Sequence, residues 1–469
     1  MYVFEAGIAM AMKDHQAAWL ARVRRGGGPL YLRLTDALAA AVRAGELQAG
    51  DRLPPQRAVA DQLGVDLTTV TRAYAAARQR GLIEGAVGRG TFVRAMASED
   101  DAGLIDLSMN LPPPPQGLSL AGALEEAVRT ILARSDPAAL MAYHPGGGSL
   151  GQKASAAAWL APVLGEVDPG QVLIAPGAQT ALAAVLSVIV ARGGQALVVE
   201  PLVYPGVLAL ARQLGLRLVL CPADAGGMDP QALERLCAQE RPAAVYLTPT
   251  TNNPTAVTLD LARREAIAQI ARAAGLIIVE DDPYSRLFAT PTPAIASLAP
   301  ERTFHIATLS KCLSPGLRIA FLVAPAGRLA QETGESLRAL SLMPAPLMAA
   351  VASSWIREGT AEKLVAGVRR EARARRAIAS VVLPLARGPA EGIHVWLDLP
   401  AGWEPARVHR LAQEKGLALV TAEVFAAGEA HPNGLRISLG GPAKQSVLRG
   451  ALESVAALVG GAAAQRLVV

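Results

Sequence analysis

The chain has 469 residues, of which 51% are hydrophobic, 18% are charged and 4% are aromatic. This length exceeds what one hydrophobic core normally supports, so we expect two or three domains. The composition excludes an intrinsically disordered chain, which would be poor in apolar residues and rich in charge. No apolar run approaches the roughly 20 residues that a membrane helix needs. The longest run, Ala181–Ala191, is expected to form a buried helix.

The three cysteines, Cys221, Cys237 and Cys312, lack the spacing of paired or metal-binding residues. An odd number of cysteines without a disulfide framework is typical of a reducing cytoplasm. We therefore expect a cytoplasmic protein with no membrane partner and no metal site.

The net charge of +5 is unevenly distributed along the chain. Residues 1–95 contain 13 Lys and Arg against 8 Asp and Glu, whereas the rest of the chain contains 32 of each kind. A basic head on a neutral body indicates a polyanionic partner for the head.

Glycine, proline and acidic residues predict the domain boundaries. Four consecutive prolines, Pro112–Pro115, favour an extended spacer between two domains. The predicted segments are an N-terminal extension at 1–28, a first domain at 29–95, a linker at 96–117, and a body at 118–469 with a large part at about 165–345 and a small part at about 346–469.

Residues 29–95 have the pattern of three helices followed by a hairpin. In the third helix, which Asp66 can cap, one buried stripe is formed by Val70, Ala73, Tyr74 and Ala77. The outward face near the N-terminus of this helix, where a recognition helix meets bases and phosphates, carries Thr68, Thr69, Thr71 and Arg72. These side chains would otherwise only solvate an exposed helix.

The hairpin has a basic, glycine-rich tip at Gly85–Gly90. Arg89 could enter the minor groove of DNA or contact a phosphate from this tip, or it could belong to a solvated turn. The head thus has the pattern of a winged helix that binds double-stranded DNA.

The stretches GDRLPPQRAVADQLGV, TTVTRAY, GLIEG and GRGTFV resemble the GntR family of winged-helix regulators. The resemblance implies that Arg57, Thr68, Thr69 and Gly88 lie where members of this family contact DNA. The family commonly has Ser or Thr followed by Arg at the start of the recognition helix, where this chain has Asp66-Leu67. An arginine that reads guanine is therefore absent here, and a carboxylate that phosphates repel is present. The operator sequence consequently does not carry over.

From residue 118 onward, helical patterns alternate with short β-branched or aliphatic runs. These runs lie at 172–174, 196–199, 216–220, 244–247, 276–279 and 303–306. Such alternation predicts an α/β domain with a mostly parallel sheet that helices cover on both faces.

Lys311 lies just after the last of these runs, in the sequence TLSKCLSPGLR. A pyridoxal 5'-phosphate (PLP) enzyme needs a lysine that forms a Schiff base with the cofactor and an acid that keeps the pyridine nitrogen protonated. Arg318 offers a two-pronged donor for the phosphate dianion, and Thr308 and Ser310 add hydroxyl groups. The segment therefore has the groups that a PLP site requires.

Two other strand ends supply groups for the pyridine ring. In VEDDPYSRLF, an Asp-x-x-Tyr spacing directs Asp281 to the ring nitrogen and Tyr284 to the ring oxygen. Asn253, in TPTTNNPTAV, could bond the same oxygen. Tyr204, in EPLVYPG, could stack on the ring or merely pack against the protein.

The stretch APGAQTAL is a glycine turn that opens a helix. The N–H groups of Gly177, Ala178 and Gln179 could receive a phosphate at this positive helix end. Each motif alone is also typical of a surface or a turn. Their order over about 140 residues, each after a predicted strand, favours a PLP site.

This set of motifs resembles the fold-type I aminotransferases, and together with the GntR-like head it resembles the MocR-type regulators over nearly the whole chain. The resemblance implies that Lys311 bonds to PLP, Asp281 faces the ring nitrogen, Asn253 and Tyr284 face the ring oxygen, and Arg318 with Ala178, Gln179 and Thr308 holds the phosphate. It also implies a homodimer, in which Tyr143, in AYHPGGGSLG, reaches the phosphate of the partner subunit. Arg436, in GLRISLGG, matches the arginine that grips a substrate or effector carboxylate. The family usually has glycine where this chain has Ala256.

The expected fold class is an α+β winged helix-turn-helix head joined to an α/β fold-type I aminotransferase-like body, with a mostly parallel seven-stranded sheet and a smaller α/β C-terminal domain. Two functions use the same residues. The body of a transcription regulator would sense PLP or a small amino compound. Alternatively, the chain would be a working aminotransferase with secondary DNA binding. The complete winged helix favours the regulator, in which half or full transamination is still possible.

Overall fold

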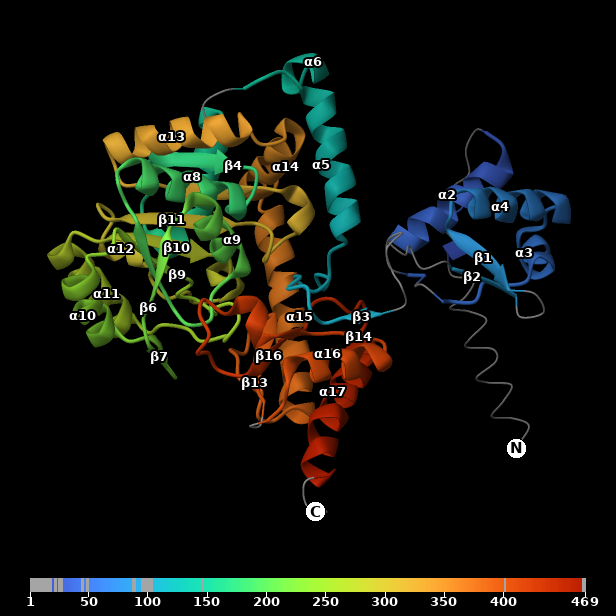
Figure 1. The fold of residues 1–469 in the computed structure, drawn as a ribbon. Coiled ribbons are helices and arrows are strands. Elements are labelled where there is room, and N and C mark those ends of the chain that lie inside the picture. Colours follow the sequence, from blue (N-terminus) through green and yellow to red (C-terminus); the bar gives the residue numbers. More distant parts are fainter. Residues whose placement is uncertain are drawn as a thin grey trace. The chain divides into compact units, whose positions relative to one another are not determined.

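The computed structural model describes residues 19–20, 23, 28–43, 46–47, 50–86, 90–93, 104–144, 147–399 and 402–465. The chain divides near residue 102 into two compact units, a head and a body (Figure 1). Within the described residues, no helix is both long and apolar enough to cross a membrane.

In the described part of the head, the structure has three α-helices and a two-stranded hairpin, as predicted. The elements of the head are α2 (Leu30–Arg43), α3 (Gln56–Leu63), α4 (Leu67–Gln79), β1 (Ile83–Ala86) and β2 (Gly90–Val93). The predicted stripe of α4 is confirmed, because Val70, Ala73, Tyr74 and Ala77 are all buried. They pack with Leu38 of α2 in one hydrophobic core.

The antiparallel hairpin places Ile83 opposite Val93, and both side chains are buried in the head. The tip that joins its strands, residues 87–89, lies outside the described residues. The predicted DNA contacts Gly88 and Arg89 lie outside them as well.

The large part of the body is built on a seven-stranded sheet. In spatial order its strands are β4 (Val172–Ala175), β12 (Ala320–Val323), β11 (Thr303–Thr308), β10 (Ile277–Asp282), β9 (Ala244–Leu247), β5 (Ala196–Val199) and β6 (Arg217–Leu220). Only β12 runs antiparallel to its neighbours. The predicted, mostly parallel sheet is therefore confirmed.

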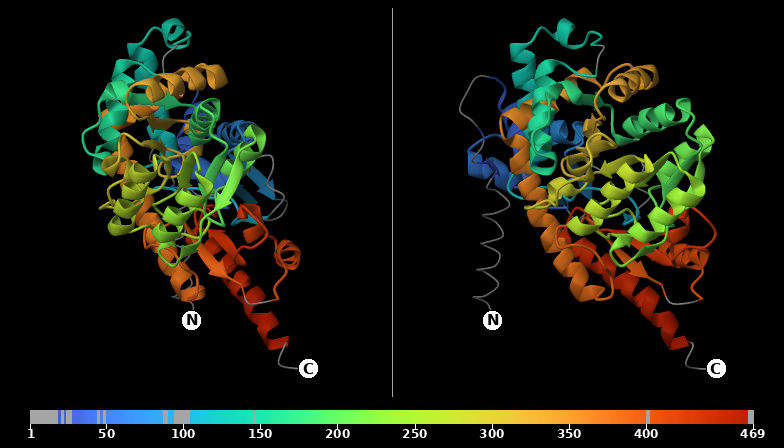
Figure 2. Two further views of the ribbon diagram at one scale, coloured as in Figure 1. Left: turned by 60° about the vertical axis from the view of Figure 1, so that its left-hand side comes forward. Right: turned by 90° about the vertical axis from the view of Figure 1, so that its left-hand side faces the viewer.

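Helices cover both faces of this sheet (Figures 1 and 2). One face packs against α8 (Ala178–Ala191), α9 (Pro205–Leu214) and α13 (Arg328–Ser341), and the other against α10 (Pro230–Glu240), α11 (Leu261–Ala274) and α12 (Ile295–Leu298). Alternate residues of a strand point to opposite faces. Accordingly, Leu197 and Val199 join the first core and Ala196 and Val198 join the second.

The body contains further α-helices before, between and after its sheets. They are α5 (Leu120–Arg134), α6 (Pro137–Leu140), α7 (Leu150–Leu164), α14 (Pro346–Arg357), α15 (Thr360–Val382), α16 (Pro405–Glu414) and α17 (Gln445–Gln465). The small part has a sheet in the order β13 (His394–Asp398), β16 (Gly434–Ser438), β15 (Val420–Thr421). A short ribbon, β7 (Ala223–Asp224) with β8 (Gly227–Met228), lies in the large part.

The structure differs from the predicted linker over residues 104–117. There β3 (Ile105–Asp106) pairs in parallel with β14 (Leu417–Ala418), and Leu107 is fully buried in the core of the small part. Two glycines allow this segment to approach closely. A Cβ atom on Gly440 would lie 1.8 Å from the carbonyl oxygen of Leu111, and one on Gly441 would lie 2.3 Å from that of Asp106. The body thus begins at least a dozen residues before the position predicted from the prolines.

Ala256, which stands where the related regulators usually have glycine, adopts a left-handed backbone conformation with φ of 58°. An L-residue with a Cβ atom is disfavoured there by about 1–2 kcal/mol. We expect Ala256→Gly to raise the free energy of unfolding by about 1 kcal/mol, after allowing for the greater freedom of glycine in the unfolded chain. The measurement is the urea midpoint of the full chain at an unchanged m value.

The control is Ala339→Gly on an exposed turn of α13, which should lower the midpoint because glycine disfavours helix. A lower midpoint for both variants would contradict strain at Ala256.

Candidate functional site

A cavity of about 450 Å³ lies at the carboxyl ends of the central strands, where parallel sheets present their ligands. It brings together eleven of the residues predicted from sequence: Ala178, Gln179, Tyr204, Asn253, Asp281, Tyr284, Thr308, Ser310, Lys311, Arg318 and Arg436. They come from both parts of the body, so both parts contribute to the lining of the cavity.

Asp281 lies near the end of strand β10, and only one of its two carboxylate oxygens has a hydrogen-bond partner among the described residues. Its Oδ2 accepts a hydrogen bond of 2.7 Å from the Tyr246 hydroxyl, whereas the buried Oδ1 has no partner among the described residues. Burial raises the pKa of Asp281 to about 6, although the Tyr246 bond acts in the opposite direction. A free, buried carboxylate oxygen fits the protonated ring nitrogen of PLP.

Lys311 follows β11 and is largely enclosed. Burial, and after it the charge of Arg436, lowers the pKa of Lys311 to about 8. Its Nζ donates a hydrogen bond of 2.7 Å to the main-chain carbonyl of Asn110. At pH 7 about one amine in ten is then neutral, and the neutral amine is the form that attacks a carbonyl group.

A cationic cradle lies beside the first turn of α8. The helix begins at Ala178 without a side-chain cap, which leaves its first N–H groups available. Gly177 permits the close passage of Arg318, because a Cβ atom on Gly177 would lie 2.4 Å from the Arg318 Nη2 atom. The hydroxyls of Thr308 and Ser310 lie 3.0 Å apart and line the same cavity. Guanidinium, N–H and hydroxyl donors together suit a phosphate dianion.

Arg436 in β16 carries a buried guanidinium, with only 7% of the side chain exposed. Its Nη1 donates to the Asn253 side-chain oxygen at 2.8 Å, its Nη2 donates to the main-chain carbonyl of Ser108, and the group stands 5.0 Å from the centre of the Phe425 ring. Among the described residues, no acidic side chain forms an ion pair with Arg436. A buried cation without an anion favours a ligand that carries a carboxylate.

The sequence pattern missed four contributors to this site: Ser108, Asn110, Tyr246 and His394. Tyr246 lies in an otherwise aliphatic strand. A buried tyrosine hydroxyl usually has a hydrogen-bond partner, and this need is the signal that could have pointed to a polar neighbour. Ser108 and Asn110 were assigned to the linker because prolines follow them.

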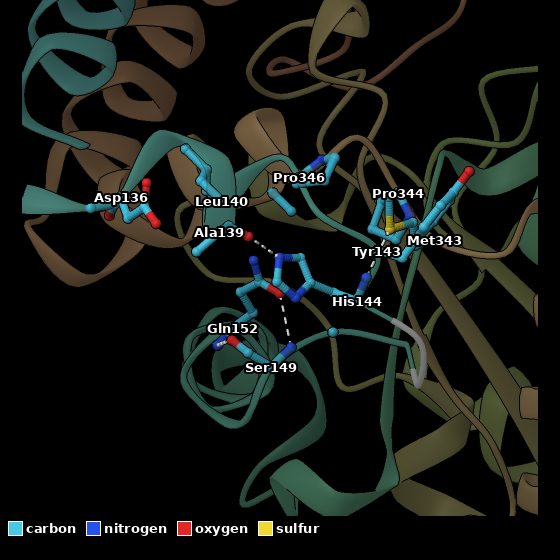
Figure 3. A pocket seen from close by; sticks show the side chains of 13 residues that line it. Asp136, Ala139, Leu140, Tyr143, His144, Ser149, Gln152, Met343, Pro344 and Pro346 are labelled. Carbon is cyan, nitrogen blue, oxygen red and sulfur yellow. Dashed lines mark hydrogen bonds between the residues drawn. The ribbon is translucent and has the colours of Figure 1, made fainter. Parts of the chain in front are cut away.

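Tyr143 does not lie in this cavity. Its side chain is 77% exposed and lines a second hollow of about 540 Å³, together with His144 and Met343 (Figure 3). There His144 is held by its Nε2 atom, 2.9 Å from the carbonyl oxygen of Ala139. The role of Tyr143 at the phosphate of a partner subunit stays a prediction.

Among the described residues, the candidate DNA contacts lie on α3 and near the N-terminus of α4. Arg57, Thr68, Thr71 and Arg72 are exposed and Thr69 is half-buried. Asp66 accepts hydrogen bonds from the Thr68 N–H at 2.7 Å and from the Thr68 hydroxyl at 2.5 Å, and these bonds lower the pKa of Asp66. The predicted cap is therefore confirmed. The Asp66 carboxylate, at the position where the GntR family commonly has Ser or Thr, is hydrogen-bonded to the Thr68 side chain.

The Arg72 guanidinium lies 4.5 Å from the centre of the Tyr31 ring. This contact orients the arginine on the exposed face of α4.

Comparisons with known proteins agree with this geometry. Residues 102–453 match the aminotransferase class I and II family, and residues 30–93 match the bacterial regulatory proteins of the gntR family. The fold is thus that of a PLP-dependent aminotransferase body joined to a winged-helix head. The chain belongs to the MocR-type regulators, which combine these two domains.

Proteins similar to this chain include both transcription regulators and aminotransferases. The chain is 30% identical over 443 residues to the uncharacterised HTH-type transcriptional regulator YdeF of Bacillus subtilis, covering 92% of this chain and 95% of the relative. It is 28% identical to the vitamin B6 salvage pathway transcriptional repressor PtsJ of Salmonella typhimurium, covering 86% of this chain and 93% of the relative. Among solved structures, LysN, the α-aminoadipate aminotransferase of Thermus thermophilus in complex with N-(5'-phosphopyridoxyl)-L-leucine, has a TM-score of 0.69 at 28% identity and covers 83% of this chain and 98% of that chain.

The lowered pKa of Lys311 predicts how its reactivity depends on pH. Because the pKa of Lys311 is about 8, most of the amine is protonated at a pH below this value. The rate of reaction with added PLP should therefore rise about tenfold per pH unit from pH 6 and level off above pH 8. The measurement is the initial rate at which visible absorption appears.

Lys311→Ala is the control and should develop no such absorption. A rate that continues to rise as far as pH 10 would show that Lys311 has the pKa of an ordinary lysine.

Proposed function

We propose that this chain is a DNA-binding transcription regulator whose body binds PLP and senses PLP or a small amino compound. One observation carries the sensing step. Lys311 and Arg436, the two cations that would meet such ligands, both donate to main-chain carbonyls of one short segment, at Asn110 and Ser108. This segment is the first part of the body to follow the head along the chain.

The cavity supports PLP as the cofactor. The free oxygen of Asp281 suits the ring nitrogen, and the reactive Lys311 suits the aldehyde. When bound, PLP supplies an electron sink for amino compounds. The other proposed roles are ring-oxygen contacts from Asn253 and Tyr284, stacking by Tyr204, phosphate contacts from Arg318, Ala178, Gln179, Thr308 and Ser310, and a further phosphate contact from Tyr143 across a homodimer.

The same contacts support a route from ligand to head. Lys311 would hold the aldehyde carbon of PLP, and its Nζ would then no longer donate to the Asn110 carbonyl. Arg436 would hold a ligand carboxylate in place of the Ser108 carbonyl. Both changes would alter the contacts of residues 108–110, the segment that follows the head along the chain. A ligand shifts DNA binding only as far as it binds two states of the chain differently.

The exposed face of α4 supports DNA as the partner of the head. Arg57, Thr68, Thr69, Thr71 and Arg72 would divide between contacts to phosphates and contacts to base edges. Gly88 and Arg89 would add contacts from the wing. In a homodimer, two heads would address paired half-sites.

A second function, aminotransferase activity, is favoured by one specific observation. The cavity holds both a reactive lysine and a buried arginine free of any acidic partner in the described chain, and these groups would serve an amino acid substrate as well as an effector. Turnover with a keto-acid acceptor at about 10 per second, an ordinary enzyme rate, would favour this function over sensing alone.

The proposed regulator should recognise DNA upstream of its own gene. At one fixed salt concentration, fluorescence anisotropy should show binding to this DNA tighter by about 10³-fold or more than binding to a scrambled duplex. Arg72→Ala should weaken binding by about 1–3 kcal/mol if Arg72 contacts a base, or reduce the salt dependence by about one charge if it contacts a phosphate.

Arg449→Ala, which removes an exposed arginine from α17 of the body, is the matched control and should leave binding unchanged. Equal, salt-sensitive binding to both duplexes would contradict a specific regulator acting at this DNA.

A further inference from the structure

The side chain of Asn110 occupies a position in the cavity that none of the roles above uses. Asn110 lies four residues after β3, and only 4% of its side chain is exposed. Its backbone is held in place, because Asp106 Oδ1 accepts hydrogen bonds from the N–H groups of Ser108 at 2.7 Å and Met109 at 3.1 Å. Leu107 N–H also donates to the Ala418 carbonyl at 2.9 Å. The side chain of Asn110 is therefore presented to the cavity from a fixed turn.

The amide nitrogen of Asn110 has two neighbours within hydrogen-bond distance. The Tyr284 hydroxyl lies at 2.8 Å and His394 Nδ1 lies at 3.0 Å. An amide nitrogen carries two hydrogens, which is one for each neighbour. Both neighbours must then act as acceptors.

The surroundings of His394 fix this assignment. Its Nε2 lies 3.1 Å from the carbonyl oxygen of Asn252, which can only accept, so Nε2 carries the hydrogen and Nδ1 carries the lone pair. Burial, and after it the charge of Arg436, lowers the pKa of His394 to about 3, so the imidazole is neutral. An amide oxygen turned toward Nδ1 would be repelled, and the amide nitrogen therefore faces His394.

The orientation of the Asn110 amide determines where the Tyr284 hydroxyl can donate its hydrogen. Because this hydroxyl accepts from Asn110, its own hydrogen must point to another acceptor, and none is found for it among the described residues. Burial raises the pKa of Tyr284, so the hydroxyl stays protonated. The titratable and charged groups around it are Asp281, Tyr204 and Arg436, together with His394, whose ring centre lies 5.5 Å from that of Tyr284, and Lys311 in the same cavity.

We propose that Asn110 is a positioning residue that makes the Tyr284 hydroxyl a hydrogen-bond donor toward the ring oxygen of the cofactor. This inference rests on the proposed binding of PLP. The contact between Lys311 and Asn110 uses the main-chain carbonyl of Asn110, so side-chain substitutions at residue 110 keep the acceptor that Lys311 uses before PLP binds. The positioning role of the side chain can therefore be tested separately from that contact.

The test uses the full chain loaded with PLP and follows visible absorption against pH. In Asn110→Asp, a carboxylate accepts the Tyr284 hydrogen and turns it away from the ring oxygen. The negative charge on that oxygen then holds the neighbouring proton on the Lys311 nitrogen more strongly. The pH midpoint of the absorption change should rise by about one unit, as expected for the loss of one hydrogen bond to a charged group.

A Tyr284→Phe background separates positioning from the added charge. If Asn110 acts through the Tyr284 hydroxyl, then Asn110→Asp should cause little further shift in that background. An equal shift with and without the hydroxyl would overturn the inference. Asn110→Ala removes the donor without adding charge and should give a smaller upward shift, which Tyr284→Phe also abolishes. If the Asp variant does not fold, an unmoved midpoint in Asn110→Ala overturns the inference.

Asn433→Asp is the matched control. The Asn433 amide donates to the carbonyl of Trp403 at 2.9 Å and, like that of Asn110, has a buried oxygen without a partner among the described residues, but it lies outside the cavity. It should not move the midpoint, and an equal shift there would overturn the role of Asn110. An unsubstituted chain that develops no visible absorption with PLP would overturn the proposed cofactor and this inference with it. Normal absorption with unmoved midpoints in both Asn110 variants would overturn this inference alone.

Discussion

The buried guanidinium of Arg436 joins three segments that are distant in sequence: β16 of the small part, Asn253 of the large part and Ser108 of the segment that enters the body. Burying a cation is costly unless hydrogen bonds and nearby electron-rich groups replace its water. Two acceptors and the Phe425 ring do so in part, yet the Arg436 Nε atom has no partner among the described residues. The cavity is thus lined by a guanidinium whose N–H groups a carboxylate ligand would pair more completely than the protein does.

The rest of the cavity follows the same electrostatic logic. Lys311, Arg318 and Arg436 place three cationic side chains around one space, and their mutual repulsion contributes to the lowered pKa of Lys311. Asp281 supplies the opposing charge at the ring position, where Tyr246 holds one of its oxygens. A ligand with a phosphate, a protonated ring nitrogen and, once joined to an amino acid, a carboxylate matches this pattern of charges.

Much of the cavity could be predicted from the sequence, because strand ends in a parallel sheet converge at one edge. Lys311 and Asp281 each follow a short run that the sequence predicts to be a strand, and the structure brings both to the same cavity. The helix α4 of the head could be predicted as well, because the apolar residues from Val70 to Ala77 follow an unbroken helical period. The specific pattern of side chains, rather than the overall composition, carried these predictions.

The remaining contributors could not be predicted, for identifiable physical reasons. The strand Ile105–Asp106 has only two residues, too few to show a period, and Pro112–Pro115 directed attention to a linker. Asn110 gains its role only through tertiary contacts with Tyr284 and His394, 174 and 284 residues away. Sequence spacing carries no record of such contacts.

The central claim is that occupancy of the cavity reaches the head through residues 108–110, so the most direct measurement is the ratio of DNA dissociation constants with and without PLP. The account predicts a ratio that differs from one by about 5- to 150-fold in the unsubstituted chain, the usual range of coupling between two sites, and a ratio of one in Lys311→Ala. A ratio of one in the unsubstituted chain, while its visible absorption shows that PLP is bound, would contradict the account.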